Sequence, residues 1–258
     1  MVAMIEFSKM HGAGNDFILV DDRDGVFPAD DHRLMADLCE RRTGIGAEGV
    51  ILVQKSDVAD FRMRFFNPDG TEAELCGNGA RCVAAFARRI GAVDSKCMCF
   101  ETLAGTIDAE IIDETNVRIS MPRPKSLKGD FVVAGVPHKI VAVENLADTD
   151  VEGEGRRIRL SEEFAPDGTN VDFVAYHAPD RLSMRTYERG VEAESGACGT
   201  GACAAAVVGV ASHGLKFPIK VTTVKGYCLV VDGKYADGEF SEITLTGPVK
   251  NVFTGVLP

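Results

Sequence analysis

Alternating apolar and polar positions recur along the chain and predict many short β-strands. The alternation begins near the N-terminus, where Ile5 and Phe7 share one face. The apolar run at residues 50–53 does not alternate, which is typical of a strand buried on both faces. Asp232-Gly233 lies between two strand-like segments and predicts a hairpin turn. Further alternating segments lie at residues 61–65, 117–121 and 182–186.

Helical periodicity is rarer. Residues 32–42, 79–90 and 201–212 are predicted to be helices, and each is followed by a glycine of the kind that commonly ends a helix. Many strands with few helices indicate a mixed α/β (α+β) fold. The chain of 258 residues is long enough for two modest domains.

Composition and charge narrow the class of protein. The apolar fraction of 45% and the charged fraction of 26% are those of an ordinary globular protein. The formal net charge is −11 and basic residues cluster only in pairs, so we expect no nucleic-acid partner. No apolar run approaches the roughly 18–20 residues of a membrane span, and the N-terminus lacks a secretory signal pattern. We therefore expect a cytoplasmic protein with no membrane partner.

The chain has eight cysteines, most of them expected to be free thiols in a reducing compartment. Cys97 and Cys99 form a C-x-C pair, but no second pair stands at zinc spacing, so we interpret them as part of a strand and expect no metal. Four cysteines with apolar neighbours are expected to be small buried side chains: Cys39, Cys82, Cys203 and Cys228.

A short internal repeat is the most informative feature. The string C-G-[N/T]-G-A occurs at Cys76 and again at Cys198, close to half the chain length further on, and a helix of small residues is expected after each copy. Residues 122–129 contain two prolines and resemble a crossover between domains. We therefore expect two similar halves: residues 1–121 plus 246–258, carrying Cys76, and residues 122–245, carrying Cys198.

Each repeat places a cysteine where a glycine-rich turn enters a helix. Free N–H groups and the positive helix end gather there, so we expect them to stabilise a thiolate and lower its pKa. The amides of Gly77, Asn78, Gly199 and Thr200 could bind a substrate carboxylate. Two such cysteines on opposite faces of one α-carbon could epimerise it, one as thiolate and one as thiol. A single copy fits equally well a tight helix entry whose cysteine packs inward.

Other motifs are weaker indications of function. Residues 44–49 match G-x-G-x-x-G, but they follow a helix and precede a strand, so a helix end and a turn are expected. His138 could orient a cysteine or bind substrate, and a lone histidine is more often structural. Arg189 suits bidentate carboxylate binding, although surface arginines are common.

At these residues the chain resembles the diaminopimelate epimerase family, and the likeness runs nearly end to end. The ordered motifs are K-M-H-G-A-G-N-D-F at residues 9–17, R-T-G-I-G at 42–46, F-N-P-D-G at 66–70, C-G-N-G-A-R-C at 76–82, P-H at 137–138, G-T-N-V-D-F at 168–173, Y-E-R-G at 187–190 and A-C-G-T-G-A at 197–202.

The resemblance implies two pseudo-symmetric domains, each a curled, mostly antiparallel sheet or barrel around a central helix, with the active site in the cleft between them. It implies epimerisation of LL- to meso-2,6-diaminopimelate in lysine and peptidoglycan precursor synthesis, without pyridoxal phosphate or any other cofactor. Cys76 and Cys198 would be the acid–base pair and His138 a supporting residue. The implied substrate-binding residues are Asn15, Asn67, Gly77, Asn78, Asn170, Glu188, Arg189, Gly199 and Thr200.

Several alternatives stay open from the sequence. Val136 and Gly49 stand where many family members carry Asn and Gln, so recognition of the distal end of the substrate is undecided. The same chemistry on a different amino acid is the second interpretation. A thiol redox protein and a non-catalytic amino-acid-binding protein belong to other classes. Neither homodimer formation nor the cysteine that deprotonates each stereoisomer follows from the sequence.

Overall fold

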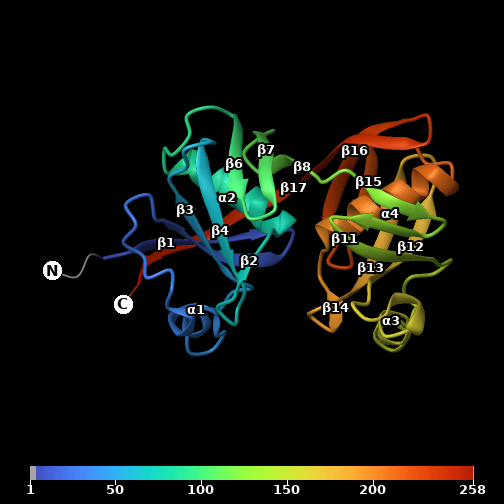
Figure 1. Cartoon of the computed structure of the whole chain (residues 1–258), viewed down its shortest axis with the longest axis horizontal. Helices are drawn as coiled ribbons and strands as arrows, with labels where there is room; N and C mark the ends of the chain where they lie inside the picture. The colour runs from blue at the N-terminus through green and yellow to red at the C-terminus, as the bar shows by residue number, and fades with distance from the viewer. Residues whose placement is uncertain (1–3, 258) are drawn as a thin grey trace. The chain divides into compact units, whose positions relative to one another are not determined.

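The computed structural model describes residues 4–257, which fold into two units with similar elements. Unit 1 runs to Ile119 and includes the segment from Gly247 onward, whereas unit 2 is Ser120–Thr246. In each unit a mostly antiparallel sheet curls around one central helix (Figure 1). This confirms the predicted fold class.

Unit 1 is a closed barrel of eight strands. Its strands follow the order β17-β1-β2-β3-β4-β6-β7-β8, and β8 pairs with β17 to close the ring. The elements are β1 Glu6–Gly12, β2 Asn15–Asp21, α1 His32–Cys39, β3 Val50–Gln54, β4 Phe61–Phe66, the short β5 Glu72–Ala73, α2 Gly77–Arg89, β6 Cys97–Thr102, β7 Gly105–Ile111 and β8 Asn116–Ser120.

Unit 2 also has a sheet of eight strands, in the order β9-β10-β11-β12-β13-β15-β16-β17. Its last strand, β17, continues along the chain into unit 1. The elements are β9 Lys125–Lys128, β10 Phe131–Ala134, β11 Val136–Ala142, α3 Val151–Arg159, the 3-10 turn η1 Glu162–Phe164, β12 Asn170–His177, β13 Arg181–Glu188, β14 Ala193–Ser195, α4 Gly199–Ser212, β15 Ile219–Thr222, β16 Cys228–Ala236 and β17 Glu239–Val256.

The helices lie where the sheets require crossovers. Parallel neighbours need a crossover connection, which is usually a helix. Within unit 1, α1 connects the parallel strands β2 and β3, and α2 connects β4 and β6. Within unit 2, α3 connects β11 and β12, and α4 connects β13 and β15. The cysteine repeats therefore introduce the second crossover helix of each unit.

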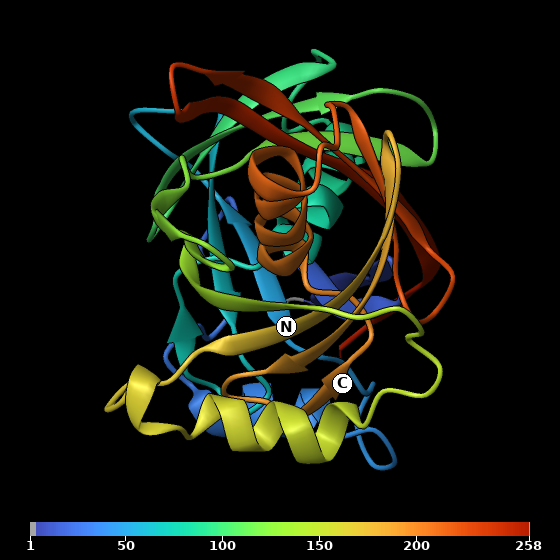
Figure 2. The same cartoon turned by 90° about the vertical axis from the view of Figure 1, so that its right-hand side faces the viewer.

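Small side chains allow these two helices to occupy the barrel interiors. Ten of the fourteen residues of α4 are buried, from Gly199 to Gly209, because the helix is apolar on every side. Figure 2 shows α4 enclosed by the strands of unit 2, with α3 across the outside of the same sheet. In unit 1, α2 is buried from Asn78 to Ala87 except at the half-buried Ala85, and its last two residues are the basic pair Arg88-Arg89. Cations are favourable at that end of a helix.

The sequence did not predict α3, because Gly153 and Gly155 both weaken helix propensity. Asp150 caps the helix by accepting from the Gly153 N–H at 2.9 Å. Gly155 faces the buried Tyr187, and a Cβ there would lie 2.4 Å from the Tyr187 Cβ. The tyrosine therefore packs directly on the helix backbone.

We expect Gly155→Ala to destabilise unit 2 by about 2 kcal/mol, because overpacking against a buried ring exceeds the gain in helix propensity. Glu154→Ala on the exposed side of α3 removes only a surface ion pair with Arg157 and should cost less than about 1 kcal/mol. Thermal unfolding of both variants measures the difference. Equal midpoints for the two variants would contradict this packing.

Some local predictions were wrong. Asp232-Gly233 is not a turn: β16 continues through it with a bulge, and the chain reverses at the next Asp-Gly pair, where Asp237 and Gly238 have φ of 53° and 80°. Both central residues of a tight hairpin need positive φ, which Asp237-Gly238 supplies. Cys228 is exposed rather than buried, whereas Cys39, Cys82 and Cys203 are buried as predicted.

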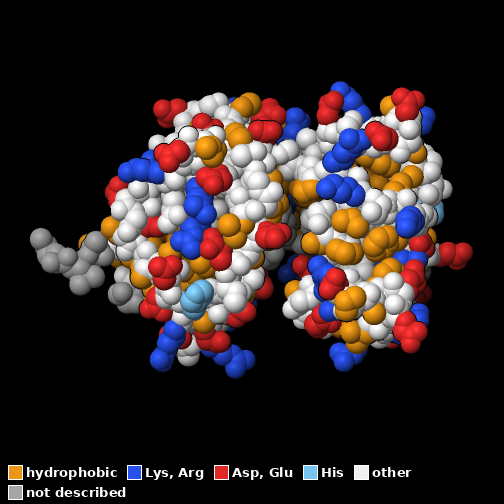
Figure 3. Space-filling view, in the orientation of Figure 1, with side chains coloured by type: hydrophobic (Ala, Val, Ile, Leu, Met, Phe, Trp, Pro, Cys, Tyr) orange, Lys and Arg blue, Asp and Glu red, His pale blue; other side chains and the backbone are white. Residues whose placement is uncertain are grey.

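Among residues 4–257, no helix is long and apolar enough to cross a membrane. Acidic and basic side chains are interspersed over the face of each unit shown in Figure 3. No broad basic surface is visible on that face, which agrees with the acidic net charge of −11.

Candidate active site

One group of predicted site residues lies at the start of α2 in unit 1. Cys76 is the N-cap residue, with φ −126° and ψ 117°, and its carbonyl accepts the first helical hydrogen bond from Ala80 at 2.7 Å. The sequence therefore placed the cysteine correctly at a helix entry. Cys76 is half-buried, and the N–H groups of Gly77 and Asn78 follow it in the first helical turn. N–H groups at the start of a helix can bind an anion.

The backbone approaches closely around this turn. A Cβ on Gly12 would lie 2.7 Å from the Asn78 carbonyl oxygen, so only glycine allows β1 to pass there. The buried Asn78 side chain accepts a 2.7 Å hydrogen bond from Arg81, which is itself fully buried. This contact holds the first turn of α2 in one conformation.

Two further predicted residues of unit 1 lie on neighbouring segments. Asn15 begins β2, and its Nδ2 lies 4.0 Å from the Cys76 Sγ. Its Oδ1 is buried and has no hydrogen-bond partner among the described residues. Asn67 lies in the turn after β4 and donates to the Thr71 hydroxyl at 3.2 Å. The structure therefore places Asn15 beside Cys76, whereas a contact between Asn67 and the substrate stays a prediction.

A second group of predicted site residues lies at the start of α4 in unit 2. Cys198 is again the N-cap residue, with φ −104° and ψ 113°. Its Sγ accepts from the Gly201 N–H at 3.3 Å and lies 3.4 Å from the Thr200 hydroxyl. The Cys198 side chain is buried, with 7% of its surface exposed. Gly199 and Thr200 occupy the positions that correspond to Gly77 and Asn78.

A line of buried polar side chains extends from Thr200. The Thr200 Oγ1 lies 3.0 Å from His138 Nε2, and His138 Nδ1 lies 2.7 Å from Asp172 Oδ2. Both His138 and Asp172 are fully buried. Thr186, paired with Asp172 across β12 and β13, donates to the other carboxylate oxygen at 2.7 Å. His138 therefore reaches Cys198 through the threonine hydroxyl.

The remaining predicted residues of unit 2 lie at the ends of β12 and β13. Asn170 is buried, donates to the Pro137 carbonyl at 3.2 Å and accepts from the Arg189 N–H at 2.8 Å. These bonds fix the start of β12 against the end of β13. Glu188 is the last residue of β13. The Arg189 guanidinium donates to the Asp167 carbonyl at 3.4 Å.

The prediction of a lowered thiol pKa was wrong for Cys198. Burial, together with the carboxylates of Glu188 and Asp172, raises the pKa of Cys198 well above its usual value. The Thr200 hydroxyl and the Gly201 N–H act in the opposite direction and are outweighed. The sequence suggested the helix start but not the two carboxylates around it. In this structure Cys198 is therefore a thiol at neutral pH.

We expect iodoacetamide to label Cys198 slowly near neutral pH and faster only above the usual thiol pKa of about 8.5, because the thiolate is the reactive form. The exposed Cys97 and Cys228 should be labelled first. Peptide mass spectrometry after timed labelling at several pH values measures each site separately. Labelling of Cys198 as fast as Cys97 at neutral pH would contradict the raised pKa.

One departure from the family pattern has a structural reason. A Cβ on Gly49 would lie 2.4 Å from the Phe66 carbonyl oxygen and 2.6 Å from the Phe65 ring. A side chain at position 49, such as the glutamine that the resemblance led us to expect, does not fit this backbone. Val136, the other departure, is half-buried at the start of β11.

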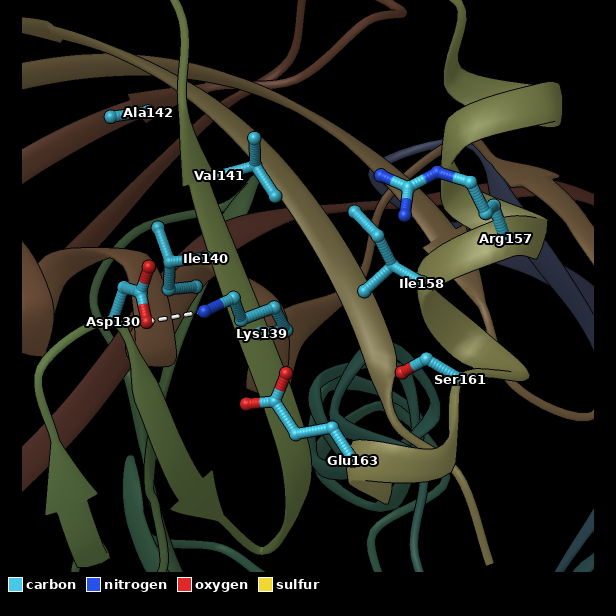
Figure 4. Close-up of a pocket in the computed structure, with 9 residues that line it drawn as sticks. All are labelled: Asp130, Lys139, Ile140, Val141, Ala142, Arg157, Ile158, Ser161 and Glu163. Atoms are coloured by element: carbon cyan, nitrogen blue, oxygen red, sulfur yellow. Dashed lines mark hydrogen bonds and ion pairs between the residues drawn. The ribbon is translucent and has the colours of Figure 1, made fainter. Parts of the chain in front are cut away.

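A pocket of about 540 Å³ lies on unit 2, away from the cysteine (Figure 4). None of the predicted site residues lines it. Lys139 and Asp130 form an ion pair within it, and Val141 and Ile158 face each other across it. The complete lining is Asp130, Lys139, Ile140, Val141, Ala142, Arg157, Ile158, Ser161 and Glu163. No group of three potential metal ligands occurs among residues 4–257.

Sequence reasoning missed Asp172, Thr186 and the hydroxyl of Thr200. The available signal was an acidic residue inside the otherwise apolar strand at residues 171–175. A buried carboxylate requires partners, so its position alone indicated a polar network.

Comparison with solved structures identifies the fold. The fold of two sheet-wrapped helices is shared with a PhzF-family phenazine biosynthesis protein of Bacillus anthracis, which is 17% identical, covers 99% of both chains and has a TM-score of 0.76. A hydroxyproline epimerase from Agrobacterium vitis, solved with trans-4-hydroxy-L-proline, is 19% identical over 98% of this chain and 91% of its own, with a TM-score of 0.68. The protein thus has the two-unit fold found in PhzF proteins and amino-acid epimerases.

Sequence comparison identifies the family within that class. The profile of diaminopimelate epimerase matches residues 7–127 and 131–252. The diaminopimelate epimerase of Aquifex aeolicus is 42% identical over 98% of both chains, and that of Chlorobaculum tepidum is 42% identical over 96% of this chain and 99% of its own. The chain belongs to the diaminopimelate epimerase family.

Proposed function

We propose that the protein is an isomerase that converts LL-2,6-diaminopimelate to meso-diaminopimelate with two cysteines and no pyridoxal phosphate. The observation that carries this proposal is the repeated helix start, in which Cys76 is the N-cap residue of α2 and Cys198 is the N-cap residue of α4. Membership of the diaminopimelate epimerase family supports the substrate. The reaction would serve lysine and peptidoglycan precursor synthesis.

The chemistry requires one proton to leave the α-carbon and another to arrive on its opposite face. One cysteine acts as thiolate and takes the first proton, and the other acts as thiol and supplies the second. Because the pKa of Cys198 is raised, Cys198 carries the proton at the start of a turnover, and Cys76 is then the base. The reverse reaction starts with the roles exchanged.

The neighbouring groups bind the reacting end of the substrate. N–H groups of Gly77, Asn78, Gly199 and Thr200 hold the carboxylate and offset the negative charge that develops on it in the transition state. The buried Asn15 Oδ1, which has no partner among residues 4–257, accepts from the substrate ammonium group. Substrate contacts are further assigned to Asn67, Asn170, Glu188 and Arg189, which the family motifs contain.

We further propose a cytoplasmic enzyme whose partner is the small-molecule substrate, and which needs neither nucleic acid nor membrane. The acidic surface charge and the absence of a basic cluster from the sequence support this. We also propose that the protein forms a homodimer, which a sedimentation measurement would test.

A panel of amino acids tests the substrate. We expect epimerisation of LL- and meso-diaminopimelate, measured by chiral chromatography, and no reaction of proline, hydroxyproline or glutamate. Turnover of another amino acid with none of diaminopimelate would replace the proposed substrate while keeping the two-cysteine chemistry. Turnover of a dithiol reductant alone would favour a redox protein instead.

A further inference from the structure

Four side chains of unit 2 form an unbroken line that ends on a buried carboxylate. The line runs from Cys198 through Thr200 and His138 to Asp172, with separations of 3.4, 3.0 and 2.7 Å. It draws on three elements, α4, β11 and β12. Unit 1 has no equivalent in sequence, because Asn78 replaces Thr200 and Ile51, in the strand β3 that corresponds to β12, is apolar.

The Asp172 carboxylate can only accept hydrogen bonds, and this fixes which atom donates in each hydrogen bond of the line. Asp172 accepts from Thr186 on one oxygen, so its other oxygen accepts from His138 Nδ1–H. A neutral His138 then has a lone pair on Nε2, which accepts from the Thr200 hydroxyl. The Thr200 oxygen keeps lone pairs for the Cys198 S–H. Each donor in the line therefore meets one acceptor.

We propose that the Thr200 hydroxyl and His138 form a relay that takes the proton of Cys198, and that Asp172 is the positioning residue of this relay. This deepens the proposed function, on which it rests, because two-base epimerisation needs Cys198 to exist both as thiol and as thiolate. Cys198 is buried, so direct exchange with solvent is restricted.

The proton transfer balances without any further reactant. The Cys198 S–H bond breaks as a new O–H bond forms on Thr200, and the original Thr200 O–H bond breaks as an N–H bond forms on His138 Nε2. The product is a thiolate and an imidazolium with Thr200 unchanged, its hydroxyl now donating to sulfur. The Asp172 carboxylate offsets the positive charge of the imidazolium. The reverse transfer restores the thiol.

Other ionisable groups near Cys198 also affect the stability of its thiolate. Glu188 at the end of β13 and Asp172 in β12 both disfavour a thiolate there. Tyr176 in β12 lies further along α4, where its hydroxyl donates to the Ala205 carbonyl at 3.4 Å. Burial raises the pKa of Tyr176, so it is neutral and adds no charge. An imidazolium at His138 is therefore the positive charge that the site needs.

The relay is tested with Thr200→Val, which keeps the side-chain shape and removes the hydroxyl, and with Thr200→Ser, which restores it. Tyr176→Phe is the control, since it removes the hydroxyl of a half-buried residue beside α4 that lies outside the relay. The measurement is the pH dependence of Cys198 labelling by iodoacetamide, followed by peptide mass spectrometry. It requires no enzymatic turnover, and thermal unfolding confirms that each variant is folded.

We expect Thr200→Val to raise the midpoint of Cys198 labelling by about one pH unit, because the thiolate loses a hydrogen-bond donor. Thr200→Ser should restore the wild-type midpoint, and Tyr176→Phe should not move it. The kcat/KM for diaminopimelate should fall on the order of a hundredfold in Thr200→Val and less than about tenfold in Thr200→Ser. Equal midpoints in wild type and Thr200→Val would overturn the relay.

Asp172 is tested on His138, because its charge also acts directly on Cys198. In the wild type, ¹⁵N NMR should show the His138 proton on Nδ1, from which it is donated to Asp172. In Asp172→Asn the proton should move to Nε2, which can then no longer accept from the Thr200 hydroxyl. A wild-type proton on Nε2 would overturn the positioning role. If the labelling and NMR results hold while diaminopimelate is not turned over, the proposed function fails and the relay stands.

Discussion

Cys76→Ala and Cys198→Ala are each expected to abolish epimerisation, with a loss of kcat/KM on the order of ten-thousandfold. Either substitution leaves one face of the α-carbon without a group that can take or give a proton. Each variant should still exchange the α-proton of one stereoisomer with solvent, and the two variants should differ in which isomer exchanges. Chiral chromatography and NMR in heavy water measure the two activities separately.

Matched controls exist on the same two helices. Cys82 lies in α2 and Cys203 in α4, both buried and both outside the first helical turn. Their alanine variants should retain kcat/KM within about threefold, since such substitutions act through packing alone. Full epimerisation by either Cys76→Ala or Cys198→Ala would contradict the two-base mechanism.

Gly201→Ala is expected to damage both stability and activity. A Cβ there would lie 2.5 Å from Asp172 Oδ1 and 3.2 Å from the Met184 Cε. Asp172 has little freedom to move, because Thr186 and His138 hold its two oxygens. The overpacking should lower the free energy of unfolding by about 2 kcal/mol and displace His138 from Thr200. We expect kcat/KM to fall on the order of tenfold to a hundredfold.

Gly79→Ala is the control, since Gly79 occupies the third position of α2 as Gly201 does in α4. Its Cβ would meet the end of the Ile51 side chain at 2.9 Å, and a terminal methyl group can rotate away. Both substitutions gain the same helix propensity, so the difference in unfolding midpoint isolates the contact with Asp172. Identical midpoints and activities for the two variants would show that Asp172 is free to move.

Strong local patterns explain what the sequence predicted. The cysteine caps, the central helices and the C-x-C strand follow from glycine-rich entries, small-residue periodicity and alternation, all of which act within a few residues. The strand at residues 182–186 is found as β13, which extends it to Arg181–Glu188. The diaminopimelate epimerase motifs added the family and the fold of the whole chain.

Long-range contacts explain what the sequence did not predict. Helix α3 exists because Tyr187 packs on Gly155, although its two glycines oppose a helix. The reversal at Asp237-Gly238 instead of Asp232-Gly233 depends on pairing with β17. Asp172 meets Thr186 only through the register of β12 and β13, and meets His138 only because β11 lies beside β12. The raised pKa of Cys198 follows first from burial and then from the carboxylates of Glu188 and Asp172, none of which the motif shows.

The most direct test of the two-cysteine mechanism is the first phase of turnover of LL-diaminopimelate in heavy water, followed by NMR. A thiol that has exchanged with solvent supplies the new proton, so the first meso product should carry deuterium at the inverted carbon while the remaining LL substrate keeps its α-proton. Product that retains the original proton would show that one group carries it from face to face. That result would contradict a pair of cysteines acting on opposite sides.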